Sequence, residues 1–467
     1  MLKVFNSLTE QKEEFIPLDK GKIRMYVCGP TVYGPGHIGH ARTYSAFDMI
    51  RRYLEYLHYQ VNYVVNITDV HDDMIKRARE QNTDLFSLGK KYTDVFFKDL
   101  TALHIQPATV HPKVTEHIPE IISLIQILLK KRFAYETEDG VYFKVSAFAD
   151  YGKLSKIKKT TQVTGLRVNT DKYEKHSAQD FALWKKVKTG EEGIASWDAP
   201  FGNGRPGWHI ECSAMNLKHL GTQIDLHGGA QDLKFPHHEN EIAQSEAATG
   251  KKPFVKYWLH SGFLNVEGEK MSKSLGNYIE IQDLLKKHSG KEFRFFISQM
   301  HYRSRLDFSW NELEKTIRSL NGLNLFLQRL QEVSKQGIVS DKIQKLTETA
   351  RESFIAEMND DFNFPNGWAV VYAFEKQVNK AMDLGNFSKQ DTRIVLDFFK
   401  ELDSIFEIFS WEQLTVQLTS KEKELIDLRE KLRKEKKFKE ADAVRVQLTQ
   451  LGIQLDDTSE GLKIRKL

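Results

Sequence analysis

The first seventy residues switch between a strand pattern and a helix pattern. Residues 23–28 alternate apolar and polar side chains, which predicts a strand. The turn GPTVYGPG follows, and apolar residues then recur at helical spacing over residues 41–59. The apolar run VNYVVNIT predicts a buried strand over residues 61–68. Strand, helix and strand in this order form the unit of a parallel sheet, so we expect an α/β fold.

The same pattern returns in the second half of the chain, after a long intervening segment. Residues 84–131 are helical in pattern, and AYETEDGVYFKV behind them predicts a hairpin that turns at Asp139 and Gly140. The sheet pattern restarts at QIDLHGGAQDL, and the helix HHENEIAQSEAATG and a strand within FVKYWLHSGF follow. We therefore expect a Rossmann-type parallel sheet over residues 1–310, with an inserted α+β segment at about 84–200.

The rest of the chain is helical in pattern. Leu and Phe recur at helical spacing from about residue 283 to 409, and a second helical stretch covers residues 421–451. We expect a C-terminal α-helical bundle over residues 311–412 and a small domain over residues 413–467. The basic run REKLRKEKKFKEADAVR either meets a phosphate backbone or forms a solvated helix with alternating charges.

The amino-acid composition is that of an ordinary globular protein and does not indicate a specific function. The chain is 40% hydrophobic and 28% charged, with a formal net charge of +4, which is ordinary for a globular protein. It has no apolar run of about 18 residues and no apolar signal segment at its start, so we expect a cytoplasmic protein. Two cysteines in 467 residues exclude a disulfide framework. These thiols are either bystanders or kept for chemistry.

The motif His37-Ile38-Gly39-His40 stands between the first predicted strand and the first predicted helix. Unpaired N–H groups and the helix dipole attract anions at such a helix start. His37 and His40 would add hydrogen-bond donors for phosphate oxygens, and Gly39 would let a flat purine approach the backbone. The alternative is a turn that carries two surface histidines.

A second short motif, KMSKS at residues 270–274, lies in a glycine-containing polar loop over residues 266–278. Lys270 and Lys273 suit the negative charge that develops on a transferring phosphate group. A loop of this kind can close over ATP and open again. The alternative is a solvated basic loop.

The two cysteines suggest a metal site together with a histidine and a glutamate. Cys28 precedes the first motif, and Cys212 lies in GRPGWHIECSAMN. His237 and Glu241 are four residues apart, so a helix would place both on one face. Two thiolates, one imidazole and one carboxylate make a plausible zinc site. The alternative is a pair of buried structural cysteines and a surface His–Glu pair.

HIGH and KMSKS resemble, in sequence and in order, the two ATP-binding signatures of class I aminoacyl-tRNA synthetases. Nearly the whole chain resembles the cysteinyl-tRNA synthetases, through the blocks MYVCGPTVY, NITD, GRPGWHIECSAMN, FPHHENEIAQ, KMSKSLGN and the DDFN segment at residues 360–365. KEADAVRVQLTQLGIQLDDT resembles that family's anticodon-recognition end. The resemblance implies a monomeric cysteine–tRNA ligase that uses ATP with Mg²⁺ and transfers L-cysteine to the 3′ end of tRNA(Cys).

The resemblance also assigns roles to residues. In that family one zinc ion per subunit is held by residues that match Cys28, Cys212, His237 and Glu241. The amino-acid pocket is implied to contain Thr68, Trp208 and His227. The ATP and transition-state contacts are implied to come from His37, Gly39, His40, Lys270 and Lys273.

The chain departs from the family pattern at two places. After NITD it reads Val70-His71-Asp72-Asp73-Met74, so a lysine expected near Asp73 is missing and His71 is unusual. This puts in doubt any side activity that uses that lysine. The end, EGLKIRKL, lacks the tryptophan often found there, and Asp442 and Asp457 are weak candidates for anticodon contacts.

Three other functions compete with this interpretation. A ligase that delivers activated cysteine to a small amine would typically lack the long region beyond KMSKS. An RNA-binding protein without catalysis would not need both intact ATP motifs. A nucleotidylyltransferase would share only the first histidine motif and would not need the four candidate zinc ligands. Copurifying tRNA and stoichiometric zinc would favour the synthetase.

Overall fold

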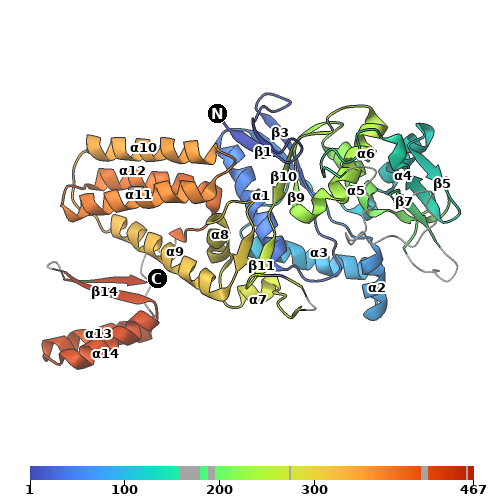
Figure 1. Cartoon of the computed structure of the whole chain (residues 1–467). Coiled ribbons are helices and arrows are strands. Elements are labelled where there is room, and N and C mark those ends of the chain that lie inside the picture. Colours follow the sequence, from blue (N-terminus) through green and yellow to red (C-terminus); the bar gives the residue numbers. More distant parts are fainter. Residues whose placement is uncertain (158–178, 188–194, 273–274, 412–418, 459–460, 467) are drawn as a thin grey trace. The chain divides into compact units, whose positions relative to one another are not determined.

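The structure is a computed structural model of the 467-residue chain. It describes the ranges 1–157, 179–187, 195–272, 275–411, 419–458 and 461–466. The chain packs as two compact units (Figure 1). The first contains residues 1–309 and 356–365, and the second contains residues 310–355 and 366–467. The domain limits expected at residues 310 and 412 remain predictions.

A four-stranded parallel sheet forms the centre of the first unit, with the strand order β10-β9-β3-β4 (Figure 1). The bounds are β3 Lys22–Val27, β4 Gln60–Val65, β9 Ile224–Ala230 and β10 Val255–Ser261. Tyr26 of β3 pairs with both His227 and Val64, so β3 lies between β4 and β9. From β3 the chain continues to β4 on one side, and β9 later pairs with β3 on the opposite side. The carboxyl end of β3 is therefore a topological switch point. This confirms the predicted parallel α/β fold.

Helix α1, Ile38–Tyr56, starts three residues earlier than the predicted helix. The reason is the His37 side chain, which accepts hydrogen bonds from the N–H groups of Gly39 and His40 and so caps the helix. Its buried residues include Phe47, Ile50 and Leu54, the face that the helical spacing predicted. The cap fixes the first motif at the edge of the sheet.

The inserted segment contains a second, antiparallel sheet in the order β5-β6-β7-β8. Its strands are β5 Ala134–Glu136, β6 Gly140–Phe143, β7 Phe181–Lys186 and β8 Gly204–Pro206. The predicted hairpin is confirmed, because β5 and β6 pair across the turn that ends at Gly140. Helix α5, Trp208–His219, begins directly after β8 and packs against α6, His237–Thr249.

Smaller elements complete the first unit. The strands are β1 Lys3–Asn6, β2 Gln11–Glu14, β11 Leu264–Val266, β12 Glu269–Lys270 and β13 Leu306–Phe308. The helices are α2 Asp72–Glu80, α3 Leu85–Ala102, α4 Ile118–Lys130, α7 Ile281–Leu285 and α8 Gly290–Ser298. Short 3-10 turns cover Val114–Glu116, Val145–Ala147 and Gln231–Lys234. The small sheet β12-β11-β13 carries Lys270, the first residue of KMSKS.

The second unit is mainly helical, as predicted. Its long helices are α9 Trp310–Gln331, α10 Asp341–Met358, α11 Phe364–Asp383 and α12 Lys389–Phe406. The rings of Trp368 and Phe406 pack with their centroids 4.7 Å apart, and both residues are buried. Among the helices of the described ranges, none is both long and apolar enough to cross a membrane.

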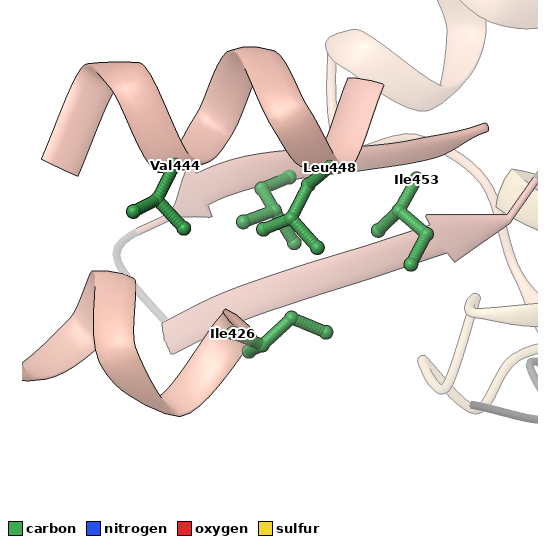
Figure 2. Close-up of a cluster of buried hydrophobic side chains, with 5 residues drawn as sticks. Ile426, Val444, Leu448 and Ile453 are labelled. Atoms are coloured by element: carbon green, nitrogen blue, oxygen red, sulfur yellow. The ribbon is translucent and has the colours of Figure 1, made fainter. Parts of the chain in front are cut away.

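The C-terminal stretch differs from the prediction of one continuous helical region. It forms two helices, α13 Ser420–Lys434 and α14 Phe438–Gln450, because Lys436 between them takes a left-handed backbone conformation with φ 61°. A hairpin of β14 Ile453–Thr458 and β15 Gly461–Lys466 follows, which the pattern did not predict. The helices and the hairpin enclose the cluster Ile426, Val444, Leu448, Ile453 and Leu455 (Figure 2).

The variant Leu448→Ala is expected to destabilise this C-terminal element by about 2–5 kcal/mol, because it leaves a cavity in a small core. Hydrogen exchange of the amides around residues 441–455 in the full chain would measure the loss. Val446→Ala on the same helix is the control, since Val446 is 58% exposed and should change stability by less than about 0.5 kcal/mol. Equal effects of the two variants would contradict the cluster in Figure 2.

Candidate active site

The parallel strands bring three candidate site residues close to one edge of the sheet. Cys28 directly follows β3, and Thr68 lies three residues beyond β4. His227 is within β9, where it pairs with Tyr26 and with Trp258 of β10. Ligands of open α/β sheets bind at this edge. The first motif and the candidate metal ligands are therefore neighbours.

Four buried side chains, one of them Cys28, meet at one point. One ligand atom each of Cys28, Cys212, His237 and Glu241 lies within 4.8 Å of the others. His237 Nε2 is 3.1 Å from Glu241 Oε1, and Cys28 Sγ is 3.6 Å from the same oxygen. Helix α6 presents His237 and Glu241 one turn apart, as their spacing predicts. The structure thus brings together all four residues of the predicted set.

Burial and mutual charge perturb the pKa values of this cluster. Burial raises the pKa of Cys28, whereas the hydrogen bond from Cys28 lowers the pKa of Cys212 to about 6. Burial opposes the charge on His237, but the neighbouring Cys212 and Glu241 raise its pKa to about 10. Burial also opposes the charge on Glu241, but His227 and His237 lower its pKa to about 2. The lowered pKa values favour the anionic forms of both Cys212 and Glu241 in this buried cluster.

A second layer of histidines contacts three of the four ligands, His237, Glu241 and Cys28. His209 Nδ1 lies 3.0 Å from His237 Nδ1, which directs the Nε2 atom of His237 to the cluster. His227 Nε2 lies 2.9 Å from Glu241 Oε2. His238 Nε2 lies 3.3 Å from Cys28 Sγ, and its Nδ1 lies 2.9 Å from His260 Nε2.

Sequence reasoning missed His209, His238 and His260. A signal was present, because His238 adjoins His237 and His209 adjoins Trp208. Within the described ranges, Cys28, His227, His238 and Glu241 form a second set of ligand atoms close enough to hold a metal ion. The set of Cys28, Cys212, His237 and Glu241 contains both thiols, and sulfur is a preferred ligand of zinc. If this set holds the metal, the remaining histidines serve as its outer hydrogen-bond partners.

The three predicted pocket residues lie around the four ligands. The ring of Trp208 faces His237 with centroids 4.5 Å apart, and Trp208 is partly exposed. His227 stacks on Trp258 at 4.4 Å. Thr68 Oγ1 donates to Glu211 Oε2 at 3.5 Å. Burial raises the pKa of this Glu211 carboxyl, and the nearby Cys212 and Asp69 raise it further.

The two rings of HIGH stack on each other with centroids 3.8 Å apart. His37 Nδ1 accepts from the N–H groups of Gly39 and His40, and His40 Nδ1 accepts from the N–H of His37. Each neutral ring therefore carries its proton on Nε2. Burial lowers the pKa of His40 to about 4, so it donates as a neutral group at pH 7. A Cβ at Gly39 would lie 2.8 Å from His37 Cε1 and would displace that ring.

The residues that follow the KMSKS loop form backbone hydrogen bonds with the HIGH segment. The N–H of Ile38 donates to the carbonyl of Ile279 at 3.1 Å, and the N–H of Ile281 donates to the carbonyl of Gly36 at 2.9 Å. A Cβ at Gly39 would also lie 3.6 Å from Met271 Cε. Lys270 is exposed on β12, whereas the predicted Lys273 lies outside the described residues.

The departures from the family pattern lie close to this site. His71 caps α2 by accepting from the N–H of Asp73 at 3.2 Å, and its ring lies edge-on to Trp208 with centroids 6.1 Å apart. Asp72 forms ion pairs with Lys185 at 2.7 Å and with Arg205 at 3.1 Å, which joins α2 to the inserted sheet. In the second unit, Asp442 is exposed on α14, and the side chain of Asp457 lies outside what the structure describes.

Comparison with known proteins decides the family. A family model described as "tRNA synthetases class I (C) catalytic domain" matches residues 14–318, and one described as "DALR domain" matches residues 353–410. The chain is 46% identical over 472 residues to a protein named "Cysteine--tRNA ligase" from Thermococcus gammatolerans, with 98% of each chain covered. The chain belongs to the cysteine–tRNA ligase family. The ligase relatives include proteins from Methanococcus maripaludis, 44% identical with 100% of each chain covered, and from Bacillus pumilus, 43% identical with 100% of this chain and 99% of the relative covered.

Solved structures support the fold of this ligase family member. A Mycobacterium tuberculosis methionyl-tRNA synthetase in complex with methionyl-adenylate superposes with a TM-score of 0.63 at 15% identity, covering 82% of this chain and 89% of that one. A second structure of the same enzyme has a TM-score of 0.64 at 14% identity, with 85% and 97% covered. The class I synthetase fold is thus shared at 14–15% sequence identity.

Proposed function

We propose that this chain is a cysteine–tRNA ligase that activates cysteine with ATP and transfers it to the 3′ end of tRNA(Cys). The observation that carries the proposal is the buried set of Cys28, Cys212, His237 and Glu241 beside the HIGH motif. Its sulfur-containing ligands favour a thiol substrate, and the HIGH motif supplies donors for the phosphates of ATP.

The four ligands fit a zinc ion by their chemistry. Two sulfurs, one imidazole and one carboxylate are a common zinc donor set, and all four are buried with an outer layer of hydrogen-bonding histidines. When bound there, zinc would take the substrate sulfur as a soft ligand and prefer it to a hydroxyl oxygen. This preference matters because a hydrophobic pocket separates near-isosteres such as cysteine and serine poorly.

The chain's own residues would then position the cysteine for activation. Trp208 and Thr68 bound the pocket and exclude water from the buried cluster. The substrate carboxylate attacks the α-phosphate of ATP, which forms cysteinyl-adenylate and releases pyrophosphate. His37 and His40 donate to phosphate oxygens through Nε2, and Lys270 and Lys273 offset the charge of the transition state. Mg²⁺ accompanies the ATP.

The second step passes the cysteinyl group to the terminal ribose hydroxyl of tRNA(Cys). The mainly helical C-terminal region would hold the tRNA, and the basic stretch around α13 and α14 supplies cations for its phosphate backbone. We propose a monomer as the working unit. A ligase that uses a small amine would not need this region, so tRNA charging separates the two functions.

Pyrophosphate exchange tests the proposal directly. Exchange is expected to depend on cysteine, to exceed exchange with serine by at least about 10³-fold, and to collapse when a chelator removes the metal. Charging of tRNA(Cys) should follow at the same metal content. Equal exchange with serine, or exchange indifferent to chelation, would contradict the proposed selection of the thiol. Exchange without tRNA charging would favour the small-amine ligase.

A further inference from the structure

Glu211 is a buried carboxylate without a cation. It lies in the first turn of α5, one residue before Cys212, and only 1% of its surface is exposed. Within the described ranges no Lys, Arg or His nitrogen lies within 4.0 Å of its carboxylate, and its one hydrogen bond comes from Thr68. A buried carboxylate without a charged partner is costly, so a cation brought next to Glu211 would be strongly favoured.

Other buried carboxylates around the site have their partners in the protein. Glu239 accepts from the backbone N–H groups of three residues, Gly152, Leu154 and Ser155. Glu246 binds the ammonium of Lys153, and Asp69 accepts from the N–H and the hydroxyl of Thr115. Lys185, whose charge acts on Glu211, donates its hydrogen bond to Asp72 instead. Glu211 differs from these residues in having acceptor capacity left over.

A chain of hydrogen bonds links Glu211, the residue before Cys212, to Gly29, the residue after Cys28. The N–H of Gly29, next to Cys28, donates to Asn66 Oδ1 at 2.7 Å. Asn66 Nδ2 donates to Thr68 Oγ1 at 3.2 Å, and Thr68 then donates to Glu211. The chain thus runs from the residue after one sulfur ligand to the residue before the other. A cysteine whose sulfur lies between these ligands would have its α-carbon substituents beside this chain.

We propose that Glu211 binds the α-ammonium group of the substrate amino acid. This inference rests on the proposed function, because it assumes that a cysteine thiol lies at the cluster of Cys28 and Cys212. An ammonium group supplies the missing cation and forms a charge-assisted hydrogen bond with the carboxylate. Thr68 acts as a positioning residue, since its hydroxyl orients the carboxylate. The opposite end of the substrate then remains directed to the ATP phosphates at His37 and His40.

Three thiols that differ by one group test this assignment on the full, zinc-loaded chain. L-Cysteine has the ammonium and the carboxylate, 3-mercaptopropionate lacks the ammonium, and cysteamine lacks the carboxylate. Calorimetry would measure their binding to the wild type and to Glu211→Gln, with the zinc content of each determined by mass spectrometry. The variant is expected to weaken cysteine and cysteamine by about 10- to 100-fold and to leave 3-mercaptopropionate within about threefold.

Two further variants separate binding from structure. Asp69→Asn is the matched control, because its carboxylate is already used by Thr115, and it should not change the order of the three thiols. Thr68→Val removes the hydrogen bond that orients Glu211 and should weaken the two amines by a smaller factor, even where Glu211→Gln proves unstable. Equal weakening of all three thiols in these variants, or none, would overturn the assignment. A wild type that holds zinc but binds none of the thiols would overturn the proposed function as well.

Discussion

Cysteine-dependent pyrophosphate exchange is expected to fall by at least about 10²-fold when Cys212 is replaced by serine, with most of the zinc lost. Losing only an outer-shell partner of a metal ligand already costs about 10- to 100-fold in affinity or activity. Cys212 is a direct ligand in the proposed site, 2% exposed and within 4.8 Å of the other three ligand atoms. The loss should therefore be at the upper end of that range or beyond it.

The physical reason lies in the difference between a thiolate and a hydroxyl. The pKa of Cys212 is lowered to about 6, first by the hydrogen bond from Cys28, so its thiolate forms at neutral pH. A serine hydroxyl stays protonated there and is a poor ligand for a borderline-soft ion. The substitution would also remove the thiolate whose negative charge stabilises the buried imidazolium of His237.

Metal content by mass spectrometry and exchange kinetics on the same preparation check this expectation. Ser213→Ala is the matched control, since Ser213 is fully buried next to Cys212 on α5 but contacts Gln244 rather than the metal ligands. That control should keep one zinc per chain. A Cys212→Ser protein with full zinc and unchanged exchange would show that Cys212 is not a ligand.

Lys270→Gln is expected to lower kcat for cysteine activation by about 10²- to 10³-fold, the range found when one preorganised stabilising group is removed from a transition state. The KM values for ATP and cysteine should change far less, because the ammonium would act mainly on charge that develops during the reaction. Steady-state exchange at varied ATP measures both quantities.

The position of Lys270 supports this expectation. Lys270 pairs with Asn265 of β11, and Asn277 Nδ2 donates to its carbonyl at 3.2 Å, so its backbone is held while the side chain is exposed. The segment beyond it forms the backbone hydrogen bonds to Gly36 and Ile38, which ties the loop to HIGH. Lys286→Gln is the control, because this exposed lysine at the C-terminal end of α7 forms its ion pair with Asp283. Equal losses in the two variants would point to a general charge effect.

Much of the site was predictable because its residues have specific chemistry. Cysteine is rare in this chain, and a His–Glu spacing of four residues places both on one helix face whatever surrounds them. The HIGH and KMSKS motifs are local, so their backbone context follows from nearby residues. The parallel sheet also followed from local patterning, because strand and helix periods are short-range properties.

Other features required the three-dimensional structure. The β14–β15 hairpin was missed because its segment contains Asp456 and Asp457, which weaken a strand pattern, and its pairing depends on packing against α13 and α14. The break at Lys436 was missed because a left-handed lysine has no local sequence signal.

The sequence by itself determined the alternation of strands and helices in the parallel sheet, the class of synthetase and the side chains capable of binding a metal ion. Only the tertiary structure decided which of them meet. It joined Cys28 to Cys212 and His238 across the whole insertion, and it left Glu211 without a cation while Glu239 and Glu246 received their partners. The reason is physical: each of these contacts depends on how distant segments of the chain pack, and residue type and spacing carry no record of that packing.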